Sequence, residues 1–269
     1  MREIVVDVQH VSKSFGSEQV LEDVTLQLMR GKIHGIIGRN GSGKTVLMKC
    51  ICGFLRPTAG KISVFGKNIG TDCDFAPKTG MLIETPGFLP HETGMSNLLW
   101  LAKLGNGARC EDVAALMRLV GLDPAAKKRV SQYSLGMRQR LGIAQVLLDA
   151  PELLILDEPT TGLDLGGREI ALRALSRVGA EQSDRAVVLV THRLEEIPQG
   201  FDHVAIMGRI TGSEADAYAD NVAGNDPAPG TIVYSGDLEH GFTSERLSEV
   251  FGLELEVTHA NGRWSAYAR

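Results

Sequence analysis

The feature that most constrains this chain of 269 residues is a glycine-rich octapeptide, GRNGSGKT, at residues 38–45. An apolar run, Ile33–Ile37, precedes it, and apolar side chains recur at helical spacing over Thr45–Leu55, which predicts strand, loop and helix in that order. Glycines let successive backbone N–H groups surround phosphate oxygens, and the start of the helix adds its positive end. The candidate phosphate-binding residues are Gly38, Arg39, Asn40, Gly41, Ser42, Gly43, Lys44 and Thr45.

Two side chains of this loop have chemistry of their own. Lys44 can bring a mobile ammonium to the β and γ phosphates of a nucleotide, and the hydroxyl of Thr45 can bind Mg²⁺ beside them. The alternative is a glycine-rich turn without a ligand. The apolar strand before the loop and the amphipathic helix after it favour the phosphate-binding interpretation.

A pair of acids follows another apolar run. Leu153–Leu156 predicts a buried strand that ends in Asp157 and Glu158. Such a strand delivers both carboxylates to the carboxyl end of a parallel sheet, where open α/β folds bind ligands. Asp157 suits the surroundings of Mg²⁺, and Glu158 is placed to orient and polarise an attacking water. The alternative is a strand end capped by two solvated acids, which the phosphate-binding loop upstream disfavours.

The order of elements predicts an α/β fold. The apolar runs Leu153–Leu156 and Ala186–Val190 are separated by residues at helical spacing, and strand, helix and strand with short links indicate a mostly parallel sheet covered by helices. The first forty residues are predicted to be strands. Residues Met95–Ala150 are helical in pattern and interrupt the alternation, so we interpret residues 90–145, approximately, as an inserted helical subdomain.

The last sixty residues change character. Residues 211–230 contain four acids and no Lys or Arg, which predicts an acidic mobile loop, or a solvated linker without a task of its own. Beyond it, Leu247, Val250 and Phe251 make one helix face, and Asn261-Gly262 is a strong hairpin signal. We therefore expect residues 231–269 to form a small helix and hairpin appendage to a main domain of residues 1–210.

Charge and hydropathy limit the partners that we expect. The net charge of −5 gives no support to a nucleic-acid partner, which usually requires a strongly basic face. No apolar run approaches the roughly 18–20 residues that a membrane-spanning helix needs. Any link to a membrane is therefore expected to come through another polypeptide.

Further motifs in a fixed order resemble those of the ABC ATPase family. Residues 134–140, SLGMRQR, stand where this family has its signature, and residues 159–164, PTTGLD, resemble its D-loop. Thr191-His192 ends a strand as the family's switch histidine does, and Phe15 matches the aromatic that stacks on adenine. The resemblance covers residues 1 to about 210. It implies a P-loop, RecA-like core with an antiparallel β subdomain near the N-terminus and an inserted helical signature subdomain.

The resemblance also implies roles for individual residues. Lys44, Glu158 and His192 would be catalytic, with His192 sensing the γ-phosphate, and Phe15 would hold the base of ATP. Thr45, Asp157 and Glu84 would surround Mg²⁺. In a dimer of two cassettes, ATP would lie between Lys44 and Ser134 of the partner subunit. The signature residues are Ser134, Leu135, Gly136 and Met137, and the D-loop acid is Asp164.

Departures from the family pattern refine the expectation. Leu135 and Met137 replace the usual glycine and glutamine, and Glu84 replaces the Q-loop glutamine, which adds a negative charge beside the phosphates. The segments IETPGF and YSLGMRQRLGIA resemble cassettes of the bacitracin and lantibiotic self-protection type. This implies a peripheral ATPase on the cytoplasmic face of the cell membrane, paired with a separate permease and a second cassette, that exports peptides or amphiphiles. An importer, a soluble ABC ATPase or a poorly hydrolysing regulatory subunit are the alternatives.

Overall fold

The computed structural model describes residues 3–84, 86–105, 109–181, 184–201, 203–209 and 228–269. Within this part of the chain, one ten-stranded sheet runs in the order β5-β4-β1-β2-β10-β9-β3-β8-β7-β6, and a separate two-stranded hairpin follows near the C-terminus. Most of the expected acidic loop, residues 211–227, lies outside the described residues.

The sheet has a parallel half and a mainly antiparallel half. The parallel strands are β9 (His203–Arg209), β3 (Ile33–Gly38), β8 (Ala186–Thr191), β7 (Leu153–Asp157) and β6 (Thr79–Leu82). The other half contains β1 (Ile4–Phe15), β2 (Glu18–Met29), β4 (Ala59–Val64) and β5 (Lys67–Asn68), all joined by antiparallel pairing. The predicted parallel α/β core with an antiparallel N-terminal part is confirmed.

Helices cover both faces of the parallel half, which explains its continuous apolar runs. Every residue of β3, β7 and β8 is buried. Along β7, Leu154 and Leu156 pack with the core under α4 (Leu135–Val146) and α5 (Leu165–Glu181). The alternate residues Leu153 and Ile155 pack with the core that contains α1 (Lys44–Cys52).

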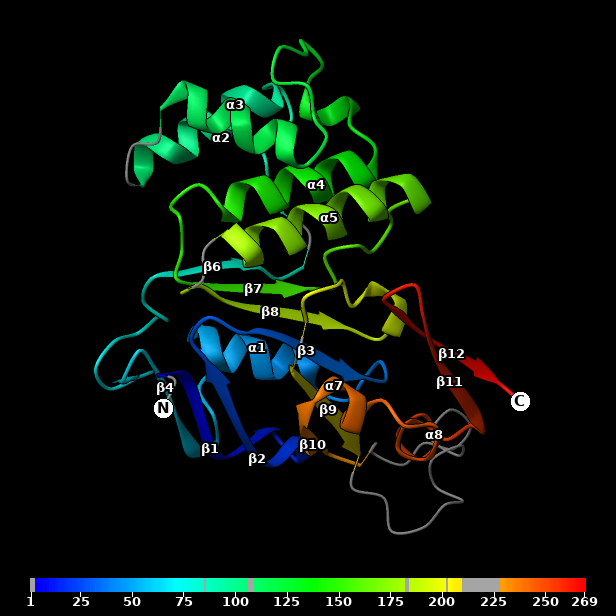
Figure 1. Cartoon of the computed structure of the whole chain (residues 1–269). Helices are drawn as coiled ribbons and strands as arrows, with labels where there is room; N and C mark the ends of the chain where they lie inside the picture. The colour runs from blue at the N-terminus through cyan, green and yellow to red at the C-terminus, as the bar shows by residue number, and fades with distance from the viewer. Residues whose placement is uncertain (1–2, 85, 106–108, 182–183, 202, 210–227) are drawn as a thin grey trace.

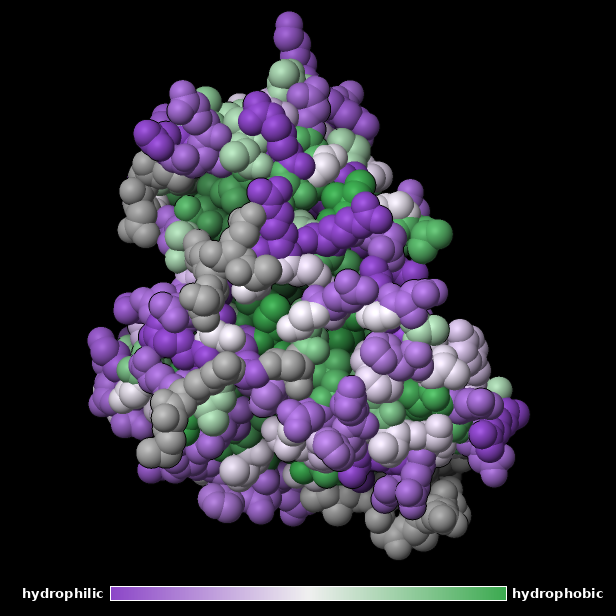
Figure 2. All heavy atoms as spheres, viewed as in Figure 1, coloured by the Kyte–Doolittle hydropathy of each residue, from purple (hydrophilic) through white to green (hydrophobic). Residues whose placement is uncertain are grey.

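The expected helical region is helical. It contains α2 (Gly94–Leu104), α3 (Cys110–Leu119), the short 3₁₀ helix η1 (Val130–Gln132) and α4. Figure 1 shows α2 and α3 as an outer layer, with α4 and α5 between them and β6, β7 and β8. In Figure 2, hydrophobic residues are visible where the outline narrows between this helical part and the rest of the molecule.

Helix α1 is shorter than its sequence pattern suggested. The apolar spacing extends to Leu55, but the helix ends at Cys52. Gly53 ends it because this residue takes a left-handed conformation, with φ 90°, and its backbone N–H bonds the carbonyls of Lys49 and Cys50. An added Cβ on Gly53 would lie 2.1 Å from the carbonyl oxygen of Asp74, so the helix end is fixed by tertiary packing.

The C-terminal region adds a strand that the sequence pattern did not reveal. β10 (Gly230–Asp237) pairs with β9 in antiparallel fashion and meets β2 at Gly230 and Leu21. Helices α7 (Leu238–Gly241) and α8 (Ser244–Phe251) follow, and the Thr243 side chain caps α8. The predicted hairpin is confirmed as β11 (Leu255–Ala260) and β12 (Arg263–Ala268), with the left-handed residues Asn261 and Gly262 at its turn.

Candidate nucleotide-binding site

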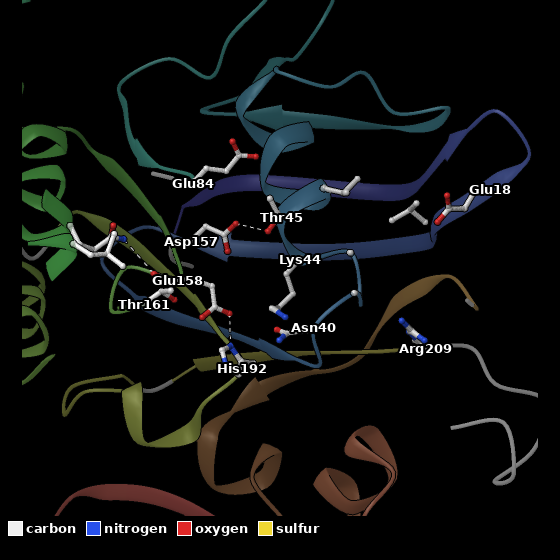
Figure 3. Close-up of a pocket in the computed structure, with 16 residues that line it drawn as sticks. Glu18, Asn40, Lys44, Thr45, Glu84, Asp157, Glu158, Thr161, His192 and Arg209 are labelled. Carbon is white, nitrogen blue, oxygen red and sulfur yellow. Dashed lines mark hydrogen bonds and ion pairs between the residues drawn. The ribbon is translucent and has the colours of Figure 1, made fainter. Parts of the chain in front are cut away.

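A cavity of about 760 Å³ opens at the carboxyl ends of β3, β7 and β8 (Figure 3). Its volume falls within the range of small-molecule sites. The phosphate-loop residues enter from β3, and the acidic pair enters from β7. The residues that line it are Glu18, Val20, Asn40, Gly41, Gly43, Lys44, Thr45, Val46, Glu84, Leu135, Gln139, Asp157, Glu158, Thr161, His192 and Arg209.

The glycines of the loop allow a backbone path that other residues would obstruct. Gly41 and Gly43 have φ angles of 80° and 86°, in the left-handed region that favours glycine. A Cβ on Gly43 would lie 2.5 Å from Leu21. Gly43 also caps the start of α1, so the positive end of that helix faces the cavity. This arrangement is suited to binding phosphate.

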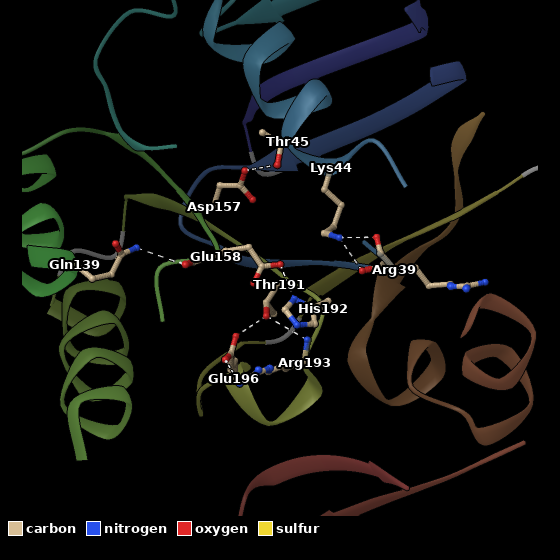
Figure 4. Close-up of polar contacts among 11 residues, drawn as sticks. Arg39, Lys44, Thr45, Gln139, Asp157, Glu158, Thr191, His192, Arg193 and Glu196 are labelled. Carbon is tan, nitrogen blue, oxygen red and sulfur yellow. Dashed lines mark hydrogen bonds and ion pairs between the residues drawn. The ribbon is translucent and has the colours of Figure 1, made fainter. Parts of the chain in front are cut away.

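The ammonium of Lys44 is held inside the loop. Its Nζ donates to the backbone carbonyl oxygens of Gly38 and Arg39, each at 2.8 Å (Figure 4). Burial lowers the pKa of Lys44, while the nearby charges of Glu158 and Asp157 act in the opposite direction. Among the described residues, the hydrogen bonds of this ammonium go to two carbonyl oxygens. A buried cation in such a place gains strongly from an anionic oxygen, so a phosphate is the ligand that this position favours.

Thr45 and Asp157 meet beside Lys44. The Thr45 hydroxyl donates to Asp157 Oδ2 at 2.6 Å, and the other carboxylate oxygen, Oδ1, is buried without a hydrogen-bond partner among the described residues (Figure 3). Burial raises the pKa of Asp157, and the hydrogen bond from Thr45 opposes this rise. An unpartnered buried carboxylate oxygen is costly unless a cation or donor meets it.

The donor set fits Mg²⁺ shared with a nucleotide rather than a metal held by protein alone. Among the described residues, no group of three or more His, Cys, Asp or Glu side chains is arranged to hold a metal. Mg²⁺ is usually bound by one or two oxygens of the protein together with water and substrate phosphates. Thr45 Oγ1 and Asp157 Oδ1 supply oxygens of this kind next to the phosphate loop.

Glu158 and His192 form a contact across two strand ends. Glu158 Oε1 lies 2.8 Å from His192 Nδ1, and both side chains are about a quarter to a third exposed (Figures 3 and 4). The backbone of Glu158 is left-handed, with φ 48°, and its N–H donates to Val190. A non-glycine residue in this conformation is strained by about 1–2 kcal/mol, and such strain gathers at functional sites.

A buried network fixes the segment that carries His192. The Thr191 hydroxyl donates to the carboxylate of Glu196, which is 2% exposed, and Thr191 Oγ1 accepts from the backbone N–H of Arg193 (Figure 4). Glu196 lies in the short 3₁₀ helix η2 (Leu194–Glu196). Hydrogen bonds therefore join η2 and Arg193 to the residue that immediately precedes His192.

Glu84, the residue at the Q-loop position, lines the same cavity but is paired with a lysine. Its Oε1 lies 2.5 Å from Lys49 Nζ, and its backbone is left-handed with φ 65°. Lys49 lies one helical turn after Thr45 on α1, so both side chains face the same side of the helix. The negative charge expected beside the phosphates is thus accompanied by a positive one.

The signature residues begin helix α4. Ser134 caps this helix, with its hydroxyl accepting from the backbone N–H of Met137 at 3.1 Å. Leu135 lines the cavity, whereas Ser134, Gly136 and Met137 do not. A Cβ on Gly136 would lie 2.9 Å from Leu163, so α4 packs closely against the residues after the acidic pair.

The D-loop acid caps the next helix. Asp164 Oδ1 accepts from the backbone N–H of Gly167 at 2.7 Å, at the start of α5. Asp164 does not line the cavity, but Thr161 of the same loop does. Phe15 also lies outside the residues that line the cavity. It is 45% exposed at the end of β1, with Lys13 Nζ 4.8 Å from its ring centre, and its contact with adenine remains a prediction.

Several residues of the cavity were missed in the sequence. Gln139 is one helical turn after Leu135, and its side chain reaches the carbonyl oxygen of Glu158 at 3.5 Å (Figure 4). Helical spacing could have indicated it. Glu18 and Arg209 come from the start of β2 and the end of β9, and no local pattern joins them to the phosphate loop.

Comparison with known proteins finds a family and relatives that are similar to this chain. The model of the family "ABC transporter" matches residues 21–161. The bacitracin transport ATP-binding protein BcrA of Bacillus licheniformis is 38% identical over 205 residues, which are 76% of this chain and 66% of BcrA, so the matched part spans about two thirds of that relative. The spermidine/putrescine import ATP-binding protein PotA of Fusobacterium nucleatum is 30% identical over 265 residues, 96% of this chain and 68% of PotA.

A solved structure shares the fold. The ATP-binding cassette MJ0796, in a dimeric post-hydrolysis state bound to ADP and phosphate, aligns with a TM-score of 0.69 and 22% identity over 87% of this chain and 98% of the other. The family match extends from β2 through the phosphate loop to the residues after Glu158. This chain therefore belongs to the ABC transporter family, as an ATP-binding subunit that hydrolyses ATP.

Proposed function

We propose that this chain is the cytoplasmic motor subunit of an ABC exporter that moves peptides or other amphiphilic compounds. The observation that carries the proposal is the convergence of Lys44, the Thr45–Asp157 pair and the Glu158–His192 pair on one cavity. The greater identity to a bacitracin transport protein than to a polyamine import protein supports a peptide cargo.

The residues divide the work of hydrolysis between them. The loop amides and Lys44 would bind the β and γ phosphates of ATP. A carboxylate oxygen of Glu158 would accept a hydrogen bond from water and, as the water oxygen bonds to the γ-phosphorus, take up its proton. The bond from that phosphorus to the oxygen bridging it to the β-phosphate breaks, which gives ADP and inorganic phosphate. His192 would hold Glu158 in place and contact the γ-phosphate.

Magnesium would supply charge neutralisation between the phosphates when bound. Thr45 Oγ1 and Asp157 would hold it, with the buried Oδ1 of Asp157 available for a direct or water-mediated contact. Glu84 faces the same cavity and would contribute only if its pairing with Lys49 were exchanged.

A second cassette would complete the site. Ser134 and Gly136 begin a helix of twelve residues whose positive end can meet a γ-phosphate. In the proposed dimer this end approaches the ATP that Lys44 of the other copy binds. The closed dimer then opens once the γ-phosphate is lost.

A separate permease would respond to the closing and opening of the dimer. Among the described residues, no helix is long and apolar enough to cross a membrane. Leu89, Trp100 and Leu104 are apolar and more than half exposed on α2 and the segment before it, in the helical part of the molecule. We propose that this part, with the segment from Glu84 to Leu89, contacts the permease at the cytoplasmic membrane face.

Replacing the proposed base tests the motor mechanism. Glu158→Gln should reduce ATP turnover by about 100-fold or more while ATP binding persists and a dimer accumulates. The matched control is Glu249→Gln, an exposed residue of α8, which should leave turnover unchanged. Turnover by Glu158→Gln at the wild-type rate would remove Glu158 from its proposed role.

The direction of transport is tested in cells that express the chain with its membrane subunit. Export predicts reduced accumulation and increased resistance to a peptide antibiotic such as bacitracin, and Glu158→Gln should abolish both effects. Energy-dependent uptake of a solute, lost in the same variant, would instead establish an importer.

A further inference from the structure

One arginine of the C-terminal hairpin joins two segments of the nucleotide site. Arg263 Nη2 lies 2.7 Å from Glu169 Oε2 on α5, and Arg263 Nη1 donates to the backbone carbonyl oxygen of Glu195 in η2 at 3.1 Å. The side chains of Arg263 and Glu169 are 30% and 31% exposed. A planar guanidinium with several donors can meet two such acceptors at once.

The hairpin holds this arginine in a defined place. Arg263 follows the two-residue turn and pairs with Ala260 in the β11–β12 ladder. The turn itself is attached to the segment after η2, because Gln199 Nε2 donates to the carbonyl oxygen of Asn261 at 3.3 Å. Trp264 packs edge-on against Phe242 and stacks on His259, with ring centres 5.3 Å and 4.4 Å apart. Arg263 is thus anchored on both sides.

One acceptor of Arg263, the carbonyl oxygen of Glu195, belongs to the segment next to the switch histidine. Glu195 is the middle residue of η2, and its neighbour Glu196 accepts the hydrogen bond from Thr191. Thr191 immediately precedes His192, whose Nδ1 is 2.8 Å from Glu158. A shift of η2 therefore changes the direction of His192 relative to Glu158.

The other acceptor of Arg263, the carboxylate of Glu169, belongs to the helix that follows the D-loop. Glu169 lies in the second turn of α5, the helix that Asp164 caps. The same helix contacts the segment after η2 once more, since Ser176 Oγ donates to the carbonyl oxygen of Gln199 at 3.3 Å. Helix α5 and η2 are therefore two supports of the site that Arg263 connects.

We propose that Arg263 is a positioning residue for ATP hydrolysis, which fixes the spacing between the His192 segment and the D-loop helix. We call the hairpin β11–β12, with Arg263, the clasp. The inference rests on the proposed roles of Glu158 and His192. It assigns to the C-terminal region a function in the catalytic step, because Arg263 touches neither the cavity nor the nucleotide-binding residues directly.

The test compares Arg263 with Arg269, the residue that follows β12. Arg263→Ala should lower kcat for ATP by about tenfold and leave KM within about twofold, because ATP binding does not depend on the spacing that the clasp sets. Arg269→Ala is the matched control. Among the contacts described for Arg269, its side chain pairs with Glu256 of the hairpin at 3.4 Å, and its backbone N–H bonds the carbonyl oxygen of Glu254. Arg269→Ala should therefore retain full activity. Arg263→Lys keeps the charge but loses the forked geometry and should recover part of kcat.

A second readout does not depend on catalysis. Amide hydrogen exchange in the nucleotide-free protein should accelerate at residues 194–199 and 165–169 in Arg263→Ala, and remain unchanged in β3 and β7. A double-mutant cycle with Glu169→Gln should show coupling, so that the double variant is no slower than Arg263→Ala alone.

Three results would overturn the proposal: unchanged kcat and exchange in Arg263→Ala, an equal loss in Arg269→Ala, or faster exchange throughout the molecule, which would indicate a purely structural role. Glu158→Gln is measured in parallel. If that variant kept its turnover, the proposed base would be wrong, while local exchange in Arg263→Ala would still decide whether the clasp fixes η2 and α5.

Discussion

Lys49 Nζ lies 2.5 Å from Glu84 Oε1, so a lysine of the phosphate-loop helix accompanies the glutamate that stands at the Q-loop position. The side chain of Lys49 is 30% exposed and that of Glu84 is 66% exposed. Burial raises the pKa of Asp157, and the charge of Lys49 is one of the lesser influences that oppose this rise. The cavity contains Glu84, Asp157 and Glu158, and a nearby cation reduces their repulsion of a triphosphate.

Removing that cation should weaken ATP binding through Glu84. We expect Lys49→Ala to raise the Kd for ATP about threefold to tenfold, because the Glu84 carboxylate is left facing the phosphates. Lys49→Ala combined with Glu84→Gln should recover most of the affinity, and Lys49→Arg should resemble the parent. Titration with a fluorescent ATP analogue measures all four proteins. A double variant as weak as Lys49→Ala alone would contradict the pairing argument.

Asp157→Asn should separate nucleotide binding from its dependence on magnesium. The amide can still accept from Thr45, but it carries no charge for a metal. We expect affinity for ATP in EDTA to stay within about threefold of the parent, and the gain on adding Mg²⁺ to fall by about tenfold or more. Because burial raises the pKa of Asp157, removing its charge should leave the melting temperature unchanged or higher without ligand. An undiminished response to Mg²⁺ would exclude Asp157 from the metal site.

Parts of the site that depend on local pattern could be predicted from the sequence. The run Leu153–Leu156 is apolar at every residue, and this pattern predicts both a buried strand and the two acids at its end. The structure buries every residue of β7, from Leu153 to Asp157. The hairpin turn at Asn261 and Gly262 likewise has a local cause, the left-handed backbone. These features needed no knowledge of distant contacts.

Other features depend on contacts between residues far apart in the chain. β10 was not predicted because its apolar residues are consecutive. Val233 is exposed between the half-buried Ile232 and Tyr234, so the sequence lacks the alternation of apolar and polar residues that marks a strand, and the pairing with β9 is decided by the sheet. The Lys49–Glu84 pair joins residues 35 positions apart, and the Arg263–Glu169 pair joins residues 94 apart. No local sequence pattern around a charged side chain indicates which distant residue it pairs with.

Gly162 and Leu135 provide a test of packing between the D-loop and the signature helix. Gly162 has φ 76°, and a Cβ there would lie 2.2 Å from Leu135 Cδ2. Gly162→Ala should lower the free energy of unfolding by about 2–4 kcal/mol, from backbone strain and overpacking together. Leu135→Ala should relieve the overpacking, so that the double variant recovers about half of the loss while the strain of the left-handed backbone remains. Urea unfolding measures each protein, and an additive double variant would show that the two residues do not contact.

We expect the buried His34 to make the protein less stable in mild acid. It is 4% exposed on β3 and pairs across the ladder with His203, and its Nε2 accepts from the backbone N–H of Met29 at 3.0 Å. Burial is the main cause that lowers its pKa from 6.5 to about 4, with the charge of His203 acting in the same direction. Above pH 6.5 the imidazole is neutral in both the folded and unfolded chain, so its contribution to stability is complete there.

Below pH 6.5 the unfolded chain takes up this proton and the folded chain does not, until the pH approaches 4. The free energy of unfolding should therefore fall with pH across this window, by about 2 kcal/mol at pH 5 relative to pH 8. His34→Gln keeps an acceptor for Met29 but has no proton to gain, so its loss between pH 8 and pH 5 should be smaller than that of the parent by about this amount. Urea unfolding at both pH values gives the comparison, in which carboxylates that titrate in both proteins cancel. Equal losses would mean that His34 is protonated as readily in the folded chain as in the unfolded one, and that its burial beside His203 does not suppress its charge.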